Sequence, residues 1–317
     1  MNKICVIGVY FGKLPNYFPL WLKSAKSNQN VDFYIFTDND LESNDNIFFN
    51  KMYLSDFKKL AEDTLGFSVC LDKPYKSCDF RPIYGLLFKE YLSKYDYWGH
   101  CDFDLIFGDI ESFTQKYDLA SYDRFLALGH LSLYRNTDEV NSRYKIANSK
   151  MNYKDVFTSS KHFAFDEICG MAKTYLENDY SLFSKQIFAD IASVYKRYRL
   201  GEIYPLDKKP KNYKKQVFYW EDGKIYRTYI IGKQKFTDEY VYIHFQKRPN
   251  FTFTFDPDKA NAFYITNKGF FAKDGEVTDK DIDLYNKYNG FLYELIENVK
   301  FKISTLFKKV KRKIFHR

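Results

Sequence analysis

The first 38 residues contain the pattern that most restricts the fold: an apolar run, a loop, a helical segment and a second apolar run. Residues 4–10 are continuously apolar, which is typical of a strand buried on both faces. Residues 11–16 are rich in turn formers, residues 17–27 carry apolar side chains at helical spacing, and residues 31–38 form a second strand with a polar end. A strand–helix–strand unit joins parallel strands and places ligand loops at their carboxyl ends. We therefore expect an α/β fold with a mixed, mainly parallel sheet flanked by helices.

The later segments continue this alternation. We expect helices at residues 55–66, 82–94 (with Pro82 in the first turn), 166–178 and 184–199, and strands at residues 97–102, 123–135, 217–220, 225–229 and 240–245. The two strands between residues 217 and 229 flank a turn and form a hairpin. Without a repeat or an obvious linker, the simplest organisation is one domain over residues 1–275 followed by a helical tail over residues 276–317.

Composition restricts the cellular setting. The 317 residues are 45% hydrophobic, which suffices for a large core. No run of about 18 apolar residues exists, so we expect no transmembrane helix, and the apolar start is too short for a signal peptide. Five scattered cysteines without CxxC spacing argue against a disulfide framework or a zinc site. We expect a cytoplasmic protein.

An acidic motif follows the strand predicted at residues 97–102. Asp102 and Asp104 are separated by Phe103, which we expect to point into the core. Two close carboxylates repel each other unless a cation lies between them, and oxygen ligands favour Mg²⁺ or Mn²⁺. Such an ion can stabilise a departing diphosphate. A lone DxD is more often a surface turn or a helix N-cap, but the apolar residues on both sides of this motif favour burial.

Several motifs in this order resemble the DUF6625 group of bacterial proteins. They are Phe11-Gly12-Lys13-Leu14-Pro15-Asn16-Tyr17-Phe18, Phe36-Thr37-Asp38, Asp79-Phe80-Arg81-Pro82, Trp98-Gly99-His100-Cys101-Asp102-Phe103-Asp104 and His244-Phe245-Gln246-Lys247-Arg248. That group is similar to GT-A glycosyltransferases of surface-polysaccharide synthesis. The resemblance implies a GT-A-like, Rossmann-like fold and a metal-dependent hexosyltransferase that uses a nucleotide sugar, with UDP-sugar as the expected donor.

The resemblance also implies roles for individual residues. Asp104 and His244 would bind Mn²⁺ or Mg²⁺, and Asp102 would share the ion or hold sugar hydroxyls. His244 could instead be a hydrogen-bonded core histidine. Residues expected to contact the nucleotide or its diphosphate are Tyr10, Thr37, Asp38, Asp79, Arg81, Asp102, Lys247 and Arg248. The alternatives are a structural ion pair for Asp79 and Arg81, a simple turn for Thr37 and Asp38, and a solvated loop for Lys247 and Arg248.

A second acidic pair, Asp166 and Glu167, is the candidate catalytic group. A carboxylate near the acceptor hydroxyl could accept its proton as a general base in an inverting enzyme, or orient the sugar in a retaining one. We prefer Asp166. The alternative is an acidic pair at a helix N-terminus, where the helix dipole favours it.

The basic residues are concentrated at the C-terminus. The formal net charge is +8, and residues 300–317 hold eight Lys and Arg and no acid, so the rest of the chain is neutral. Apolar residues recur among them at helical spacing, which predicts an amphipathic helix on the anionic inner face of the cell membrane. The alternatives are a solvated tail or a helix docked on its own domain. The neutral body and the lack of a nucleic-acid motif argue against nucleic-acid binding.

The partners expected are a nucleotide sugar, a saccharide or lipid-linked saccharide acceptor, and this membrane surface. Two other hypotheses remain: another metal–phosphate enzyme, such as a nucleotidyltransferase, and a noncatalytic protein that binds carbohydrate or membrane. The absence of a GxxxxGK[ST] loop in the sequence disfavours a P-loop enzyme.

Overall fold

The computed structural model describes residues 2–203, 207–246, 251–253 and 255–315, without the side chains of residue 305 and residues 307–315. The chain divides into two compact units, Met1–Gln186 and Ile187–Arg317. The division predicted after residue 275 stays a prediction.

The first unit is built on a seven-stranded sheet in the order β3-β2-β1-β4-β7-β6-β8. Strand β1 pairs in parallel with β2 and β4, and β2 pairs in parallel with β3. Strand β7 runs antiparallel to both of its neighbours, β4 and β6. The predicted mixed, mainly parallel sheet is therefore confirmed. Its strands are β1 (Ile4–Tyr10), β2 (Val31–Thr37), β3 (Ile47–Lys51), β4 (Tyr97–Cys101), β6 (Arg124–Phe125), β7 (Leu131–Arg135) and β8 (Leu182–Phe183).

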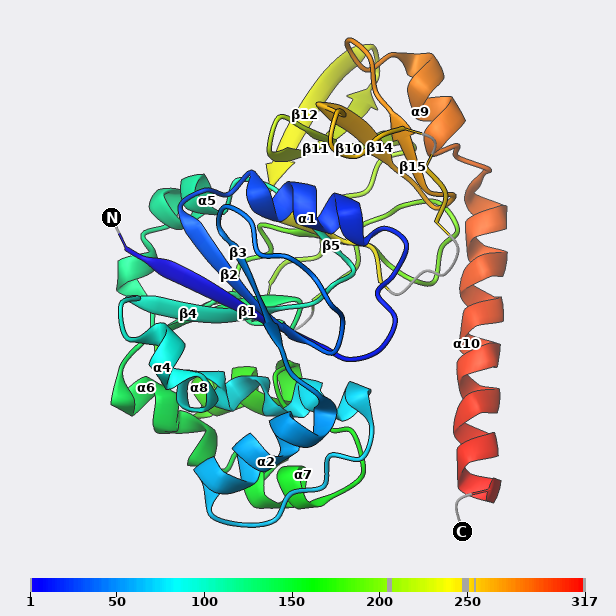
Figure 1. Ribbon diagram of the computed structural model, residues 1–317. Helices are drawn as coiled ribbons and strands as arrows, with labels where there is room; N and C mark the ends of the chain where they lie inside the picture. The colour runs from blue at the N-terminus through cyan, green and yellow to red at the C-terminus, as the bar shows by residue number, and fades with distance from the viewer. Residues whose placement is uncertain (1, 204–206, 247–250, 254, 316–317) are drawn as a thin grey trace. The chain divides into compact units, whose positions relative to one another are not determined.

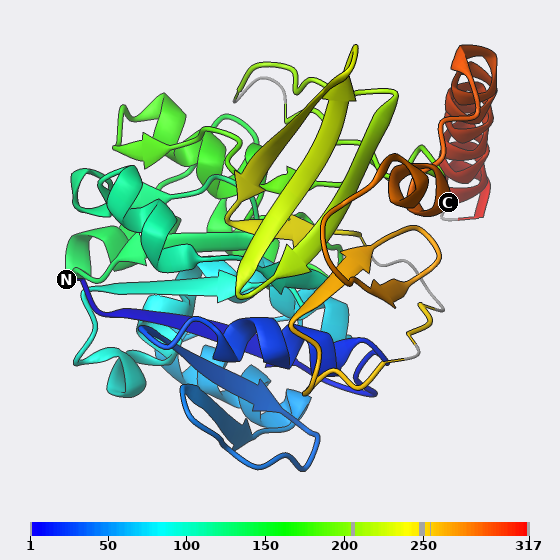
Figure 2. The ribbon, with the colours of Figure 1, turned by 90° about the horizontal axis from the view of Figure 1, so that it is seen from above.

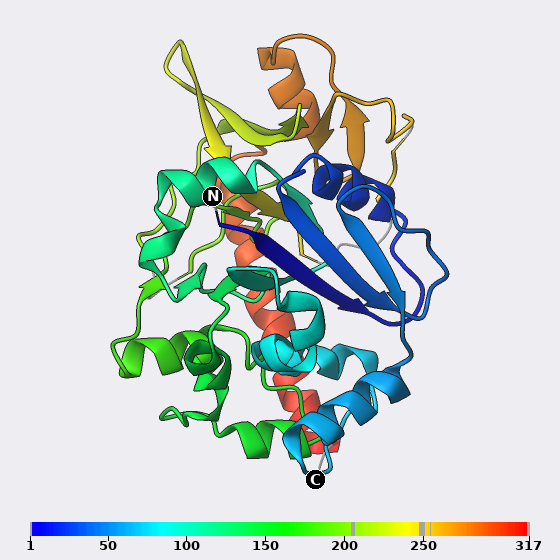
Figure 3. The same ribbon diagram turned by 60° about the vertical axis from the view of Figure 1, so that its left-hand side comes forward.

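Helices cover both faces of this sheet (Figure 1). One face carries α1 (Phe18–Lys26), α5 (Ile110–Lys116) and the short strand β5 (Leu105–Phe107). Figure 3 shows α1 on one side of β1 to β3 and α2 on the other. The second face carries α2 (Leu54–Leu65), α3 (Tyr84–Leu87), α4 (Lys89–Leu92), α6 (Asp138–Ser142), α7 (Tyr153–Thr158) and α8 (Lys173–Glu177). Short 3-10 segments lie at Pro74–Ile83, Leu119–Ser121 and Arg143–Lys145, and a π-helical turn lies at Ile168–Ala172.

Alternation along β1 explains how both faces are filled. Cys5 and Ile7 belong to the core on the α2 side, together with Phe57 of α2. On the α1 side, Gly8 leaves room for a close neighbour, because a Cβ there would lie 2.8 Å from the ring of Phe103. That ring is 5.1 Å from the ring of Trp21 in α1 and is buried, so Phe103 points into the core as predicted.

The second unit contains an antiparallel sheet in the order β12-β11-β10-β14-β15 (Figure 2). Strands β10 (Lys215–Glu221) and β11 (Lys224–Ile231) form the predicted hairpin, and β12 (Gln234–Tyr240), β14 (Ala262–Ile265) and β15 (Phe270–Ala272) complete the sheet. Helix α9 (Asp279–Tyr285) packs Ile282 into a core with Val217 and Tyr219 of β10. Strand β9 (Ala189–Asp190) pairs in parallel with β13 (Tyr242–His244).

The long helix α10 (Phe291–Phe315) ends the described part of the second unit. Within the described residues, no helix has the length and apolar character needed to cross a membrane.

One predicted element was wrong and two were wrong in part. Residues 184–199 hold β9 and loops rather than a helix, because their backbone bonds to neighbouring segments, as when Ile191 N donates to His244 O at 2.9 Å. The helix expected at residues 82–94 is broken at Phe88, whose ring stacks on Phe36 at 4.1 Å, and Pro82 lies inside a 3-10 segment. Residues 123–135 form two strands separated by a turn in which Leu126 has a φ of 70°.

Candidate functional site

The polar residues of the first unit gather where three parallel strands end. Strands β1, β2 and β4 end at Tyr10, Thr37 and Cys101. Because β7 is antiparallel to β4 and pairs Leu131 with Cys101, the turn before β7 reaches the same edge. This is the edge at which open α/β sheets bind their ligands.

The Asp102–Asp104 motif lies directly after β4. Its backbone is held by two hydrogen bonds: Asp102 N donates to His130 O at 2.8 Å, and Trp21 Nε1 donates to Asp102 O at 3.2 Å. The Asp102 side chain is 20% exposed, and Asp104 is buried. Carboxylate oxygens of the two residues lie within 4.8 Å of each other. Bonds from Mg²⁺ to oxygen are about 2.1 Å long, so a small side-chain movement lets both residues hold one ion.

Arg81 connects the motif to the second acidic pair. Its guanidinium donates to Asp102 Oδ1 at 2.5 Å, to Asp166 Oδ2 at 2.8 Å and to Gly129 O at 3.0 Å. The arginine is only 7% exposed, so these bonds are largely shielded from water. The structure thus brings Arg81, Asp102 and Asp166 into contact, although the three residues are far apart in the sequence. The alternative ion pair between Asp79 and Arg81 is wrong, since Arg81 pairs with two other carboxylates.

Asp79 is fully buried and holds the backbone of a neighbouring segment in place. It accepts hydrogen bonds from Lys76 Nζ at 2.8 Å, Phe163 N at 2.9 Å and Phe165 N at 3.0 Å. Its carboxylate therefore holds the segment that leads directly to Asp166. In this structure Asp79 forms an ion pair with Lys76, and the expectation that it contacts a nucleotide stays a prediction.

Asp166 is almost completely enclosed. Its backbone carbonyl accepts a hydrogen bond from Arg124 NH2 at 2.8 Å, and its side chain lies against Gly129. Burial raises the pKa of Asp166 to about 7, although the charge of Arg81 opposes this shift. Glu167 is more exposed and precedes the π-helical turn. A carboxyl group that titrates near neutral pH can exchange a proton with a substrate hydroxyl, and the preference for Asp166 over Glu167 in this role stays a prediction.

The end of β2 is a hydrogen-bonded turn. Asp38 Oδ1 accepts from Gly12 N at 2.8 Å and so ties this turn to the loop after β1. Thr37 is fully buried, and its Oγ1 accepts from Asn39 Nδ2 at 2.9 Å. Tyr10 packs its ring edge-on against Phe103 at 5.0 Å, and its hydroxyl donates to Lys13 O. These contacts match the turn alternative, while Tyr10 and Asp38 keep part of their surface accessible.

Sequence reasoning did not single out Tyr17 or Gly129. Burial, followed by the negative charge of Asp104, raises the pKa of Tyr17 above its ordinary value, so this phenol keeps its proton beside the acidic motif. Gly129 is required for space: a Cβ there would lie 2.4 Å from Asp166 Oδ2 and 2.9 Å from Glu167 Oε1. Tyr17 lies inside the motif 11–18 and could have been found there, whereas nothing in the sequence marks Gly129.

In the second unit, His244 is held by a carboxylate that the sequence did not reveal. His244 Nδ1 and Asp190 Oδ1 are 2.7 Å apart on the paired strands β13 and β9. A carboxylate at Nδ1 fixes the orientation of the ring, as is usual around metal-binding histidines. Asp190 was missed because its segment was predicted to be helical. Lys247 and Arg248 lie outside the described residues.

Comparisons with known proteins agree with the motif order. The DUF6625 family, a family of unknown function, matches residues 6–274. No curated protein matches the chain. Among solved structures, the galactosyltransferase LgtC in complex with donor and acceptor sugar analogues is 14% identical over 59% of this chain and 75% of its own, with a TM-score of 0.31.

A second similar structure is the apo form of the glycosyltransferase GlyE of Streptococcus pneumoniae TIGR4. It is 11% identical over 59% of this chain and 46% of its own, with a TM-score of 0.29. At these scores the likenesses carry no argument about activity, which has to come from the residues of the site.

Proposed function

The chain belongs to the DUF6625 family, and from this premise we propose that it is a metal-dependent glycosyltransferase. It would move a hexose from a nucleotide sugar, with UDP-sugar as the expected donor, to a saccharide or lipid-linked saccharide of the bacterial surface. The observation that carries the proposal is the chain of contacts Asp102–Arg81–Asp166, which joins a carboxylate pair suited to a divalent ion with a second carboxyl of near-neutral pKa.

Each part of the site has a task in this proposal. Asp102 and Asp104 hold Mn²⁺ or Mg²⁺, and His244 is proposed as a third ligand on the strength of the resemblance and of its carboxylate-fixed ring. When bound, the ion stabilises the charge that develops on the nucleoside diphosphate. Tyr10 and Asp38 are proposed to border the nucleotide, and Lys247 and Arg248 to contact the diphosphate.

Transfer exchanges one bond of the sugar for another. The bond between the anomeric carbon and the β-phosphate oxygen breaks, and its electron pair leaves with the nucleoside diphosphate. A bond forms from the acceptor oxygen to the anomeric carbon, and in an inverting course the acceptor proton passes to the Asp166 carboxylate. In a retaining course, Asp166 together with Arg81 would orient the sugar instead.

Titration calorimetry of UDP with and without Mn²⁺ tests the metal site. We expect binding that depends on Mn²⁺, with affinity reduced more than about tenfold by Asp104→Asn. Asp109→Asn is the matched control, because Asp109 caps α5 through Ser112 N at 2.9 Å and either side chain can fill that role. Metal-independent UDP binding, or an unchanged affinity in Asp104→Asn, would refute the metal role.

The donor is then identified by thermal shift against a panel of nucleotide sugars in the presence of Mn²⁺, followed by a transfer assay with the best donor. A protein that instead hydrolyses nucleoside triphosphates, or transfers a nucleotidyl group from them with release of pyrophosphate, would be a different metal–phosphate enzyme.

A further inference from the structure

Helix α10 carries a continuous stripe of exposed apolar side chains. They are Leu292, Leu295, Ile296, Val299, Ile303 and Leu306, each between 45% and 69% exposed. With about 100° of rotation per residue, all six fall within an arc about 100° wide. Soluble proteins rarely leave such a contiguous apolar surface uncovered, so the stripe requires a partner.

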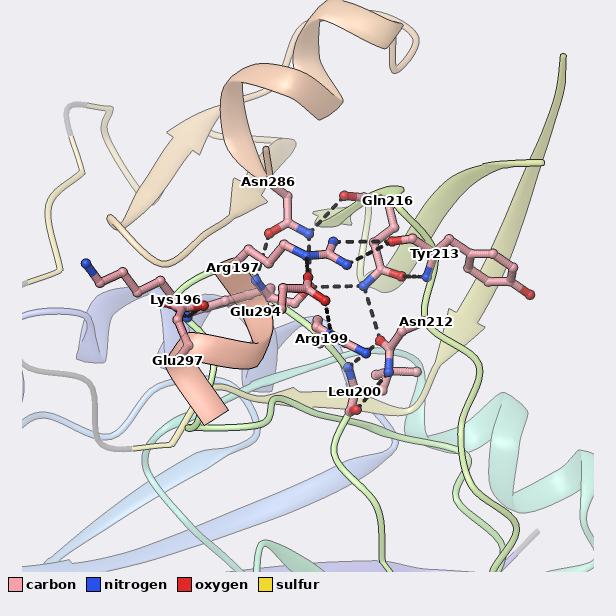
Figure 4. A network of polar contacts seen from close by, with 11 residues as sticks. Lys196, Arg197, Arg199, Leu200, Asn212, Tyr213, Gln216, Asn286, Glu294 and Glu297 are labelled. Atoms are coloured by element: carbon pink, nitrogen blue, oxygen red, sulfur yellow. Dashed lines mark hydrogen bonds and ion pairs between the residues drawn. The ribbon is translucent and has the colours of Figure 1, made fainter. Parts of the chain in front are cut away.

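The opposite side of the same helix is fixed to its own unit by polar contacts (Figure 4). Glu294 is 8% exposed and accepts hydrogen bonds from Arg197 Nε and Arg199 NH1. One turn further on, Lys196 N donates to Glu297 at 3.3 Å. On the helical wheel both glutamates lie roughly opposite the middle of the stripe. Glu294 and Glu297 are therefore engaged in contacts with the second unit, and the apolar stripe faces away from these contacts.

The connection between α9 and α10 adds further contacts that hold α10 on the second unit. Asn286 Nδ2 donates to Tyr198 O and Gln216 O, while its Oδ1 accepts from Tyr198 N at 2.7 Å. Arg197 also lies over the ring of Tyr288, 5.1 Å from its centre. These contacts hold the start of α10 in one orientation on the second unit, so the direction in which the stripe points is set by the fold.

Two partners could cover the stripe, a second copy of the chain or a lipid surface, and the positive charges around the stripe distinguish between them. The 4-3 spacing of residues 292, 296, 299, 303 and 306 would suit a coiled coil with a second copy. However, Lys300 and Lys302 flank the stripe about 80° to either side, and six further Lys and Arg follow between residues 308 and 317 with no acid. Two copies would bring like charges together along this seam, whereas an anionic lipid surface neutralises them.

We propose that α10 binds an anionic lipid surface, with the stripe from Leu292 to Leu306 in the headgroup boundary and Glu294 holding the helix by its opposite side. The proposal goes beyond sugar transfer, because lipid binding needs neither a donor nor a metal ion. It would bring the enzyme to acceptors that are themselves attached to lipid.

Vesicle sedimentation of the full chain tests the proposal, with mixed phosphatidylglycerol–phosphatidylcholine vesicles compared with phosphatidylcholine alone. We expect binding to the anionic vesicles that weakens as salt is added. Ile303→Asp should lower it at least about tenfold, because an apolar side chain that enters the headgroup boundary is replaced by an acid. Ser304→Asp introduces the same charge one residue away, on the polar side, and should retain most of the binding.

Equal binding to both vesicle types, or equal loss in the two variants, would overturn the proposal. So would a monomer that ignores vesicles, since the stripe would then be covered by the chain itself, and so would a dimer that Ile303→Asp dissociates, since the stripe would then be an interface between copies. UDP and Mn²⁺ binding by Ile303→Asp should be unchanged, which separates this result from any failure of the proposed transfer.

Discussion

Gly129→Ala should disturb the candidate base through a single methyl group. The added Cβ would lie 2.4 Å from Asp166 Oδ2 and 2.9 Å from Asp166 Cγ, well inside contact distance. Asp166 is enclosed on its other sides and bonded to Arg81 at 2.8 Å, so it can move only by giving up that bond. The substitution therefore tests whether Asp166 is held where the structure places it.

The expected cost follows from three contributions. Overpacking of an enclosed site costs about 1–3 kcal/mol, and a lost hydrogen bond between charged groups costs about 1.5–3 kcal/mol. Replacing glycine by alanine lowers the conformational entropy of the unfolded chain, which stabilises the folded state by about 0.4–1 kcal/mol. This gain applies here because Gly129 has no positive φ. The net loss in the free energy of unfolding is about 1.5–5.5 kcal/mol, a large part of the ~5–15 kcal/mol of a typical domain.

A double-mutant cycle in urea gives the measurement. In the Asp166→Ala background the carboxylate is gone and the partly exposed Glu167 side chain can move aside, so Gly129→Ala should stabilise by about 0.4–1 kcal/mol. This glycine contribution cancels in the cycle, so the coupling free energy should be about 2.5–6 kcal/mol. UDP and Mn²⁺ binding should persist in Gly129→Ala, because Asp104 is not touched. An equal cost of Gly129→Ala in both backgrounds would show that the methyl group does not meet Asp166 and would refute the geometry.

Three further predictions concern buried charges. Glu294→Gln should lower the free energy of unfolding by about 3–5 kcal/mol, because two arginines lose their carboxylate. The half-buried Glu297 should tolerate the same change within about 0.5 kcal/mol, and equal effects of the two variants in thermal melts would contradict the role of Glu294 as the buried anchor of α10. Lys76→Met should cost about 3–5 kcal/mol by leaving the Asp79 carboxylate buried without its cation, and Lys76→Met with Asp79→Asn should recover part of that loss; no recovery in urea unfolding would argue against the pair. The folded pKa of Asp166 is raised to about 7, so its protonated form contributes stability that is complete below the unfolded pKa and is lost as pH rises through about 7. If Asp166 is the general base, the rate of sugar transfer should rise over the same interval. If the pH–rate and pH–stability profiles of Asp166→Asn keep these steps, the steps belong to another group.

Local pattern was enough to predict the sheet of the first unit. The apolar runs at residues 4–10 and 31–38 depend on burial on both faces, which any parallel strand under helices requires. The hairpin around Asp222 and Gly223 was equally local, because both residues adopt the positive φ that a tight turn needs. The orientation of Phe103 followed from its position between the two aspartates, because successive side chains of an extended segment point to opposite sides.

Features that depend on distant partners were not predictable in the same way. Residues 184–199 have helical spacing, but β9 pairs with a strand more than 50 residues later, and this tertiary pairing determines their conformation. The position of Asp190 beside His244 follows from that pairing, so it was missed too. Asp79 and Arg81 do not pair with each other; apart from Lys76, their partners lie 20 or more residues away, and no spacing rule identifies them.

The small size of Gly8 has a consequence for how relatives of this chain are compared. A methyl group at that position would strike the ring of Phe103, and displacing this ring would swing the two aspartates that flank it. A chain can therefore keep both acids and still lose the proposed metal site through a substitution near the start of the first strand, almost a hundred positions upstream. Intact acidic residues are not a sufficient marker of activity in this lineage unless the glycine is present as well.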